Sequence, residues 1–523
     1  MKAQDYIISK EKFVFHTHGE RLHDTKLETK PVSYFRDAFN RFAKNKASIL
    51  ATFIIGILVL FAIIAPFCTP YEVAYEDANY AFALPRNELF YELGLNFWDG
   101  GKEIEVNKLT YDRYLAIEQE IGRKVIMTDP VIKATNSKDT TSKGPIKKDN
   151  ELYCFRLDTY SSVGAKFLLL TLEEYQALQA YQDAHNVQII LPITDLKLRP
   201  QAKQDLNDAN IWYKTKLGGG NKTEIIYDEN GGFINIYVPN NGMDEYTSKM
   251  FLEGEEKLYN YALKKDGDQY EVRVDYYEYY QYKHAKLGDG ITKPSFILGA
   301  NNAGKDLFVC LSSGARFSFI LAVVVSVVNL FVGAIYGAIE GYYGGKIDII
   351  MERIVEILGS IPFMIVITLL KYHFNVSHIV ILFISFFLTG WTGMAGRTRM
   401  QFYRFKNQEY VLVARTLGAN DRRVMFKHIF PNAIGTLVTS SVLVIPGVIF
   451  SETSLSYLGI INLSTGNLTS VGTLLATGQS YLFTYPHMIL FPSIFISLLM
   501  LSFNLFGNGL RDAFNPSLRG TEE

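Results

Sequence analysis

Long runs of hydrophobic residues alternate with charged segments along this chain. Several of these runs contain about 17 to 23 residues almost free of charge, close to the roughly 20 residues that an α-helix needs to cross about 30 Å of hydrocarbon. We therefore predict a helical polytopic membrane protein and exclude a soluble enzyme. The six predicted spans are Ile49–Ala65, Phe317–Ile339, a third ending near Leu370, Ile379–Ala395, Ile434–Phe450 and Met488–Leu505.

One long polar segment interrupts this pattern. Residues 71–294 hold 27 Lys and Arg against 36 Asp and Glu, a net charge of −9, whereas the rest of the 523-residue chain holds 25 against 17, a net charge of +8. Glycine and asparagine clusters such as 218–221, and strand-like runs such as Phe233–Val238, are typical of a mixed α+β domain. We predict that this segment is a soluble insert between the first two spans.

The charges between the spans predict the orientation, because short cytoplasmic loops hold the excess of Lys and Arg. The N-terminal tail to Ser48 has ten basic residues, the loop 396–432 has eight, and the loop 451–487 has none. Both termini are therefore expected inside and the insert outside. The first 46 residues are too charged for a cleavable signal peptide, so the first span is expected to remain as an anchor. The predicted division is tail 1–48, first span 49–66, insert 71–294, core 295–510 with five spans, and tail 511–523.

Two stretches of the insert are faintly alike. Leu109-Thr110 with Tyr114 resembles Leu170-Thr171 with Tyr175, and β-like runs follow at 124–127 and 187–191. Thr171 and Glu174 fit a capping box, which predicts a helix start. The similarity leaves two interpretations open, a duplicated α-β unit and chance.

The chain offers little that points to catalysis. Gly299 to Lys305 has the spacing of a phosphate-binding loop, but Asp306 stands where a Ser or Thr should bind Mg²⁺, and its charge would oppose phosphate. Three scattered cysteines, Cys68, Cys154 and Cys310, predict neither a disulfide scaffold nor a metal site. We expect a non-catalytic subunit that binds no cofactor or metal and takes its energy from elsewhere.

Three glycines recur every fourth residue along the second span. Gly333, Gly337 and Gly341 leave a stripe without side chains, which favours close helix packing and alternatively a smooth wall along a conduit. Glu356, near Pro362, is a costly carboxylate for a membrane segment and suggests a role. It also pairs well with Arg353 one turn earlier, which would need no function.

The basic inner loop is the most informative segment. Its sequence from Glu409 onwards predicts a helix, a sharp turn at Gly418 and a second helix entered through Pro431. Val411, Ala414 and Leu417 have the spacing of one helical face. A short helix projecting below the membrane is one interpretation, and a basic loop lying on anionic headgroups is the other.

These residues resemble the permease subunits of bacterial ABC importers, specifically the C-type subunit of oligopeptide and dipeptide importers. The signature triplet Glu-Ala-Ala of that family falls on 412–414, where Ala414 matches, its glycine on Gly418, and its Leu-Pro on Phe430-Pro431 after His428. Further similar segments are Gly341–Gly345, Leu455–Gly459 and Phe503–Asp512. The resemblance spans about residues 33–70 and 295–517 and leaves out the insert.

The resemblance implies the type I importer permease fold and a place in the bacterial plasma membrane. It implies that the chain forms half of a translocation pathway with a second homologous permease, driven by two cytoplasmic ABC ATPases that bind ATP and fed by an extracytoplasmic peptide-binding lipoprotein. No nucleic acid is implied. By the same resemblance, the ATPase-coupling residues would be Glu409, Ala414, Arg415, Gly418, Ala419, Asn420, Asp421, His428 and Pro431.

The role of the insert stays open at this level. The tyrosines in 276–282 suggest a surface that docks the binding protein, whereas an alternating strand or a membrane-interface aromatic belt explains them equally well. A membrane-anchored extracytoplasmic binding or structural module is the competing function for the whole chain, and a secondary transporter is a weaker third.

Overall fold

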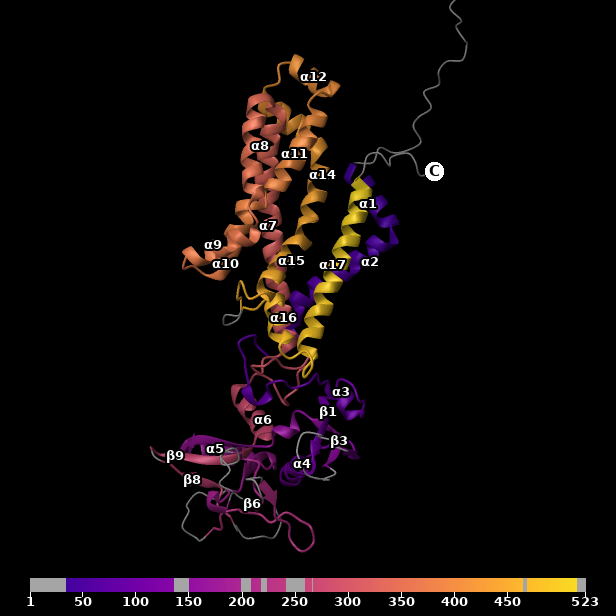
Figure 1. Ribbon diagram of the computed structural model, residues 1–523. Helices are drawn as coiled ribbons and strands as arrows, with labels where there is room; N and C mark the ends of the chain where they lie inside the picture. Colours follow the sequence, from indigo (N-terminus) through magenta and orange to yellow (C-terminus); the bar gives the residue numbers. More distant parts are fainter. Residues whose placement is uncertain are drawn as a thin grey trace, which may run out of the picture.

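A computed structural model of the chain describes residues 34–135, 150–198, 208–217, 223–240, 259–265, 267–463 and 468–514. It has two parts, a bundle of long helices and a mixed α/β part, which lie at opposite ends of an elongated molecule (Figure 1). The sequence features assigned to the first 33 residues, to the glycine run 218–221 and to the tail beyond Phe514 lie outside the described residues.

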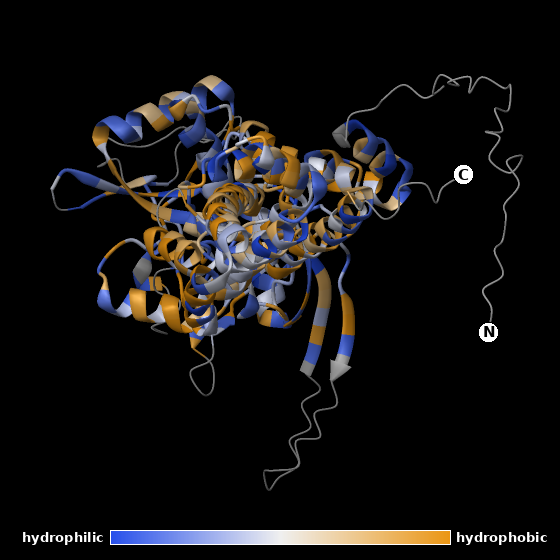
Figure 2. Cartoon of the chain, turned by 90° about the horizontal axis from the view of Figure 1, so that it is seen from above, coloured by the Kyte–Doolittle hydropathy of each residue, from blue (hydrophilic) through white to orange (hydrophobic). Residues whose placement is uncertain are grey.

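The helical part matches the hydrophobic runs of the sequence. Among the described residues, five helical segments are long and apolar enough to cross a membrane, and a sixth is possible if the pair Gly345–Ser360 and Phe363–His373, bent by 74°, counts as one span. Pro362 stands at the bend because it has no N–H with which to continue a helical ladder. Viewed end on, these helices are mostly hydrophobic (Figure 2). The five segments are Lys46–Phe67, Leu307–Tyr343, His378–Phe405, Asp421–Tyr457 and His487–Phe514.

The individual helices have the following bounds. The N-terminal ones are α1 (Tyr34–Lys44) and α2 (Lys46–Ile64). After the insert come α7 (Leu307–Tyr343), α8 (Gly345–Ser360), α9 (Phe363–His373), α10 (His378–Thr389), α11 (Thr392–Phe405), α12 (Glu409–Thr416), α13 (Asp421–Arg423), α14 (Phe430–Val442), α15 (Val444–Tyr457), α16 (Val471–Gln479) and α17 (His487–Phe514).

The glycine stripe lies where α7 crosses α11. A Cβ added at Gly333 or Gly341 would come within 2.7 Å of a backbone carbonyl oxygen of α11, that of Trp391 or of Arg399, and one at Gly337 would overlap the carbonyl oxygen of Ala395. The two backbones can approach this closely because hydrogen is the only substituent at these three positions.

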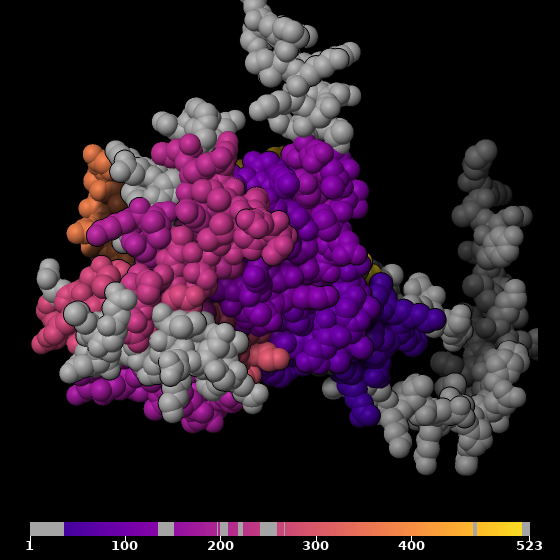
Figure 3. All heavy atoms as spheres, turned by 90° about the horizontal axis from the view of Figure 1, so that it is seen from below, coloured from indigo at the N-terminus to yellow at the C-terminus, as the bar shows by residue number. Residues whose placement is uncertain are grey.

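In the insert, the earlier residues in purple lie beside the later residues in pink (Figure 3). It is built from two small sheets and a separate two-stranded antiparallel pair, β6-β7. The first is antiparallel with strand order β1-β3-β2, and the second has the order β4-β9-β5 with β8 also paired to β9. The strands are β1 (Gly101–Asn107), β2 (Val131–Thr135), β3 (Asn150–Asp158), β4 (Ala165–Thr171), β5 (Ile190–Leu191), β6 (Thr215–Leu217), β7 (Thr223–Ile225), β8 (Ala262–Lys264) and β9 (Gln269–Asp275). The helices are α3 (Glu88–Glu92), α4 (Lys108–Ile121), α5 (Leu172–His185) and α6 (Tyr276–Leu287).

The two sheets repeat one structural unit. In each unit a seven-residue strand, β1 or β4, leads into a 14-residue helix, α4 or α5, that ends on a residue in the left-handed conformation. A side-chain oxygen of the helix, from Glu118 in the first unit and Gln182 in the second, then accepts two backbone N–H groups seven and eight residues on. The strand pairing also corresponds, since Gly101 opposes Asp158 as Ala165 opposes Asp275. The insert therefore contains a structural duplication.

The sequence comparison had placed this repeat one helical turn out of register. The side chain of Asn107, not that of Thr110, caps α4, and it accepts the Thr110 N–H at 2.9 Å. The position equivalent to Tyr175 is consequently Tyr111 rather than Tyr114. In the second unit Thr171 and Glu174 form the predicted capping box.

Buried arginines join the units to each other. Arg273 on β9 is fully buried and pairs with Glu120 on α4, while the Arg123 guanidinium bonds both carboxylate oxygens of Asp275 at 2.7 Å. Such pairs hold because each charge meets a partner in the interior. Around them, the run 233–238 makes isolated bridges to several partners rather than the regular strand that its pattern predicts.

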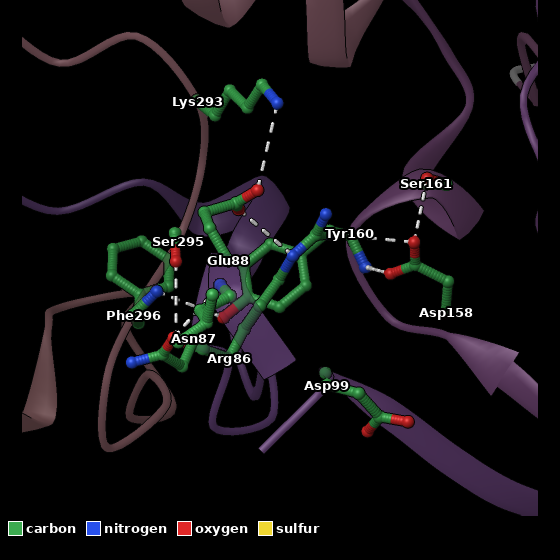
Figure 4. A network of polar contacts seen from close by, with 12 residues as sticks. Arg86, Asn87, Glu88, Asp99, Asp158, Tyr160, Ser161, Lys293, Ser295 and Phe296 are labelled. Carbon is green, nitrogen blue, oxygen red and sulfur yellow. Dashed lines mark hydrogen bonds and ion pairs between the residues drawn. The ribbon is translucent and has the colours of Figure 1, made fainter. Parts of the chain in front are cut away.

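A compact base joins the insert to the helical bundle. Its polar contacts include those of Arg86, Asp158 and Tyr160 (Figure 4). Arg86 is 2% exposed; its guanidinium lies 3.6 Å from Asp158 and 3.2 Å from Glu88. The Tyr160 hydroxyl donates to the carbonyl of Leu84 at 2.8 Å.

Contacts between aromatic rings join this base to the ends of the membrane helices. The Phe82 ring stacks on Tyr485 with centroids 4.5 Å apart, and Trp98 lies 5.7 Å from Phe491 in the first turns of α17. The insert is thus fixed to the adjoining end of the bundle at several points.

Candidate functional site

The inner loop forms a short helix, a tight turn and a return into the membrane. Helix α12 begins at Glu409 and ends at Thr416, and Gly418 follows with φ +81°, the left-handed region that a side chain penalises. The Asn420 side chain then accepts the Arg423 N–H at 2.9 Å and caps the next helical segment. This turn lies at the end of the molecule opposite the insert (Figure 1).

The inward face of this loop packs on the bundle. Val411 is fully buried beside Phe402 and Ile429. The Tyr342 hydroxyl, near the end of α7, donates to the Asp421 carboxylate at 2.6 Å, and the Arg415 guanidinium lies 5.0 Å from the centre of the Tyr342 ring. The loop is therefore attached to the last turn of α7.

The outward face of the loop is apolar and exposed. Leu417 is 81% exposed, and Leu412 and Val413 are exposed as well. Leu417 does not share the buried face of Val411 and Ala414, as its spacing had suggested. The helix ends at Thr416, and the turn carries Leu417 away from the face that packs on the bundle.

The residues predicted to couple to an ATPase lie from α12 through the turn after it to the start of α14, and most of them are exposed. Ala414 points inward, Ala419 donates its N–H to the Ala414 carbonyl at 3.0 Å, and Pro431 stands in the first turn of α14. His428 lies in a π-helical turn, Val424–Ile429, which the sequence did not predict. A π-helical turn interrupts the regular ladder and often marks a functional position.

A partly buried charge cluster joins α7, α8 and α11. The Arg399 guanidinium on α11 contacts Asp348 at 2.6 Å, Glu340 at 3.4 Å and Glu352 at 3.5 Å, and Tyr403 donates to Asp348 at 2.5 Å. Sequence reasoning missed it, because Glu340 stands alone in a hydrophobic run and nothing local indicates its partners.

The carboxylate singled out in the third span has a simpler setting. Arg353 and Glu356 form an ion pair, and both side chains are largely exposed along α8. The pairing interpretation therefore accounts for Glu356 without a further role.

The phosphate-loop spacing has a structural explanation. The Asn301 side chain accepts the N–H groups of Ala303 and Lys305 at 2.9 and 3.0 Å, and Asp306 caps α7 by accepting the Phe308 N–H at 2.9 Å. Burial raises the pKa of Asp306 to about 7. The loop is a helix cap, and among the described residues no group of three metal-ligating side chains occurs.

The tyrosine run belongs to a helix rather than to a strand. Tyr276, Tyr277, Tyr280 and Tyr282 on α6 are buried, where Tyr276 donates to Asp77 at 2.6 Å and Tyr280 to the Tyr71 hydroxyl at 3.1 Å. These tyrosines are core residues of the insert. Because they are helical and buried, these tyrosines form neither an alternating strand, nor an exposed docking surface, nor an interface belt. Those three predictions are wrong for these residues.

The long apolar helices define the chain as a multi-pass helical membrane protein. Comparison with known proteins then identifies its family. Residues 329–520 match the family described as binding-protein-dependent transport system inner membrane component, and residues 33–85 match the N-terminal TM domain of oligopeptide transport permease C.

Curated relatives cover the same part of the chain. The oligopeptide transport system permease protein OppC of Bacillus subtilis is 40% identical over 242 residues, 46% of this chain and 78% of that protein. The dipeptide transport system permease protein DppC of the same species is 37% identical over 42% of this chain and 68% of that protein. A solved structure of the MetNI methionine ABC transporter is 14% identical, with a TM-score of 0.32, over 39% of this chain and 96% of that chain.

The chain belongs to the family of binding-protein-dependent transport system inner membrane components. It is a transmembrane permease subunit of an ABC importer, as the motifs of the sequence had indicated.

Proposed function

We propose that this chain carries peptides inward as half of a permease pair, together with a second homologous permease. Two cytoplasmic ATPases bind and hydrolyse ATP for it, and an extracytoplasmic peptide-binding lipoprotein delivers the cargo. The names of the oligopeptide and dipeptide permeases at up to 40% identity support this substrate class. The chain itself then needs neither a catalytic site nor a cofactor.

One observation carries the coupling role, namely the exposed apolar edge of α12 and its turn. Leu412, Val413 and Leu417 face outward on a segment that is fixed to α7 through Asp421 and Tyr342. Exposed apolar groups gathered on a fixed scaffold are typical of a protein contact. Docking of an ATPase here would pass its movement directly to the end of α7.

In this proposal the loop end of the molecule is cytoplasmic and the insert is extracytoplasmic. The charge asymmetry supports this orientation, because eight basic residues lie in the loop 396–432 and none in 451–487. The insert would then stand above the outer mouth of the pathway, in reach of the binding protein.

The turn at Gly418 offers the test. Gly418→Trp places a bulky ring at the docking edge, and Gly418→Ala imposes the same unfavourable backbone conformation without the bulk. An added Cβ meets no atom within 4 Å, so neither variant clashes with the chain itself. We expect the Gly418→Trp protein to insert normally into the membrane. Its peptide uptake should be lost, because ATP hydrolysis by the ATPases is no longer coupled to transport.

Gly418→Ala should retain most of the uptake, since its cost is limited to backbone strain of about 1–2 kcal/mol. Normal uptake by Gly418→Trp would refute docking at this turn. Equal loss in both variants would show that backbone strain, rather than a blocked contact, is the cause.

A further inference from the structure

Two cavities in the membrane part share α14–α15 and α17 in their walls. One, of about 430 Å³, lies toward the loop end and is lined by Thr436, Ser440, Leu443 and Arg511 among others, with Arg397, Gln401 and Arg404 of α11 forming a third side. The other, of about 410 Å³, lies toward the insert and is lined by Phe450, Ser454, Tyr457, Ser493 and Ser497 among others, with Leu475 of α16 as a further border.

Helical spacing shows that these cavities share one continuous face of each segment. Thr436, Leu443, Phe450 and Tyr457 follow one another at intervals of seven residues, close to two helical turns. On α17 the lining positions from Ile489 to Arg511 recur at intervals that also keep them on one face. The cavities are therefore two sections of one path along the molecule.

A single contact divides this path. Gly507 on α17 is buried, and a Cβ added there would overlap the Leu443 side chain. Leu443 stands between α14 and α15, where the helix is interrupted. The contact between Leu443 and Gly507 thus coincides with a break in one wall.

Four serine hydroxyls on this face have no hydrogen-bond partner among the described residues, namely Ser440, Ser454, Ser493 and Ser497. Thr439 in the same lining differs, because it donates to the Gly435 carbonyl at 2.9 Å. Several hydroxyls elsewhere in the bundle are likewise bonded internally, as Ser385 is to the Ile381 carbonyl at 2.7 Å. Unpaired polar groups facing lipid are costly, so this face is expected to meet water or polar cargo instead.

The neighbouring face of α17 has the opposite character. Leu490, Ile494, Leu498 and Leu501 are exposed and wholly apolar, as a lipid-facing stripe should be. Ser497 and Leu498 are adjacent in sequence and about 100° apart around the helix. One helix therefore presents a hydroxyl-bearing face beside an apolar one.

We propose that the face shared by α14–α15 and α17 is this subunit's wall of the translocation pathway, with the contact of Leu443 on Gly507 as its constriction. This inference rests on the proposed function. The two cavity linings carry hydroxyls and three arginines but no carboxylate among the described residues. Such a wall suits the neutral, hydrogen-bonding backbone of a peptide, and its inner section suits the terminal carboxylate.

Thiol accessibility in native membranes tests this assignment. Cys68, Cys154 and Cys310 are first replaced (C68S, C154S, C310A), and single cysteines are then introduced as Ser454→Cys and Ser497→Cys on the proposed wall. Ile494→Cys and Leu498→Cys, at the same depth on the apolar stripe, serve as matched controls. The probe is a charged methanethiosulfonate reagent that does not cross lipid.

We expect the two wall thiols to react at least about ten-fold faster than the two control thiols, because a charged reagent must leave water to reach lipid-facing positions. Equal reactivity of all four, or slow reaction of the wall thiols through cover by the second permease, would overturn the proposal. Peptide uptake by the cysteine-free parent is measured in parallel. Its failure would count against the proposed function, whereas the labelling rates judge the wall independently.

Discussion

Asp306 shows how one buried carboxyl shapes the outer end of the bundle. It caps the first turn of α7 and is almost completely enclosed, so water stabilises its charged form poorly. Burial accordingly raises its pKa from 3.8 to about 7. The folded protein keeps this proton at pH values where the unfolded chain has already lost it.

This difference predicts a pH dependence of stability. Between about pH 4 and pH 7 the folded state binds more protons at Asp306 than the unfolded state, so the free energy of unfolding should fall as the pH rises. Asp306→Asn retains the capping oxygen but cannot titrate. Thermal unfolding in detergent at pH 5 and pH 7 should show a loss in the parent that exceeds the loss in Asp306→Asn by about 1–2 kcal/mol. Parallel losses in the two proteins would contradict the assignment.

Glu118 offers a second test at this scale, because the duplication supplies its own control. Its carboxylate accepts the N–H groups of Val125 and Ile126, as the Gln182 amide oxygen does in the second unit. Glu118→Gln should therefore be tolerated. Glu118→Ala leaves two N–H groups without their acceptor and should cost about 1–3 kcal/mol.

Hydrogen exchange at the amides of Val125 and Ile126 would measure this effect directly. We expect faster exchange in Glu118→Ala and parent-like exchange in Glu118→Gln. If both variants exchange alike, the carboxylate does not hold this turn.

At the scale of elements, the crossing of α7 and α11 depends on three glycines, of which Gly337 has the closest contact. A Cβ at Gly337 would overlap the Ala395 carbonyl oxygen, and backbone cannot move aside as a flexible side chain can. Gly337→Ala should force the helices apart and destabilise the protein by about 1–3 kcal/mol.

Gly396→Ala on the facing helix is the matched control, because a Cβ there meets no atom within 4 Å. It should be neutral or stabilising by up to about 1 kcal/mol, as alanine favours a helix more than glycine does. Unfolding midpoints of the two variants in detergent would compare them. A Gly337→Ala protein as stable as Gly396→Ala would show that the crossing can relax.

The elements also show what a single sequence can predict. The long helices follow from hydrophobic runs, and the turn at Gly418 follows from a residue type that tolerates φ +81°. Both are local properties. The exposure of Leu417 depends on α12 ending at Thr416, a boundary that periodicity alone does not fix.

Ion pairs between residues far apart in the sequence could not be predicted from local sequence patterns. Arg399 meets Glu340 and Asp348 across three helices, and neither carboxylate has a partner that spacing alone would indicate. The tyrosines of α6 suit a strand, a helix or a surface equally well until the sheet beside them is known. The duplication was visible in outline, but its register needed Asn107 as the cap.

At the scale of the whole molecule, the insert cannot be separated at its most obvious boundaries. Removal of 101–290 would delete Asp158, the buried partner of Arg86, and leave only the part-exposed Glu88 at 3.2 Å from the guanidinium. A buried charge that loses every partner costs about 3–5 kcal/mol, and the loss of one of two partners costs part of that. The deletion should therefore lower the amount of folded protein in the membrane, whatever the insert does.

A second variant separates folding from function. Adding Arg86→Leu to the deletion removes the guanidinium that has lost Asp158. The amount of folded protein in the membrane should then partly recover, which fluorescence-detected size exclusion would measure. Peptide uptake and affinity for the binding protein can then be compared with those of the parent. If uptake is unchanged in this variant, the insert serves another purpose than delivery of cargo.

Helix α7 connects both ends of this molecule without a break. Its 37 residues correspond to a rod of about 55 Å, anchored by the Asp306 cap at the insert and by Tyr342 beside the loop that carries α12. A rod of that length acts as a lever, so that a tilt of one degree displaces its far end by about 1 Å. A small tilt of α7 at the loop would therefore move the base of the insert by about 1 Å, a distance large enough to break or form a hydrogen bond.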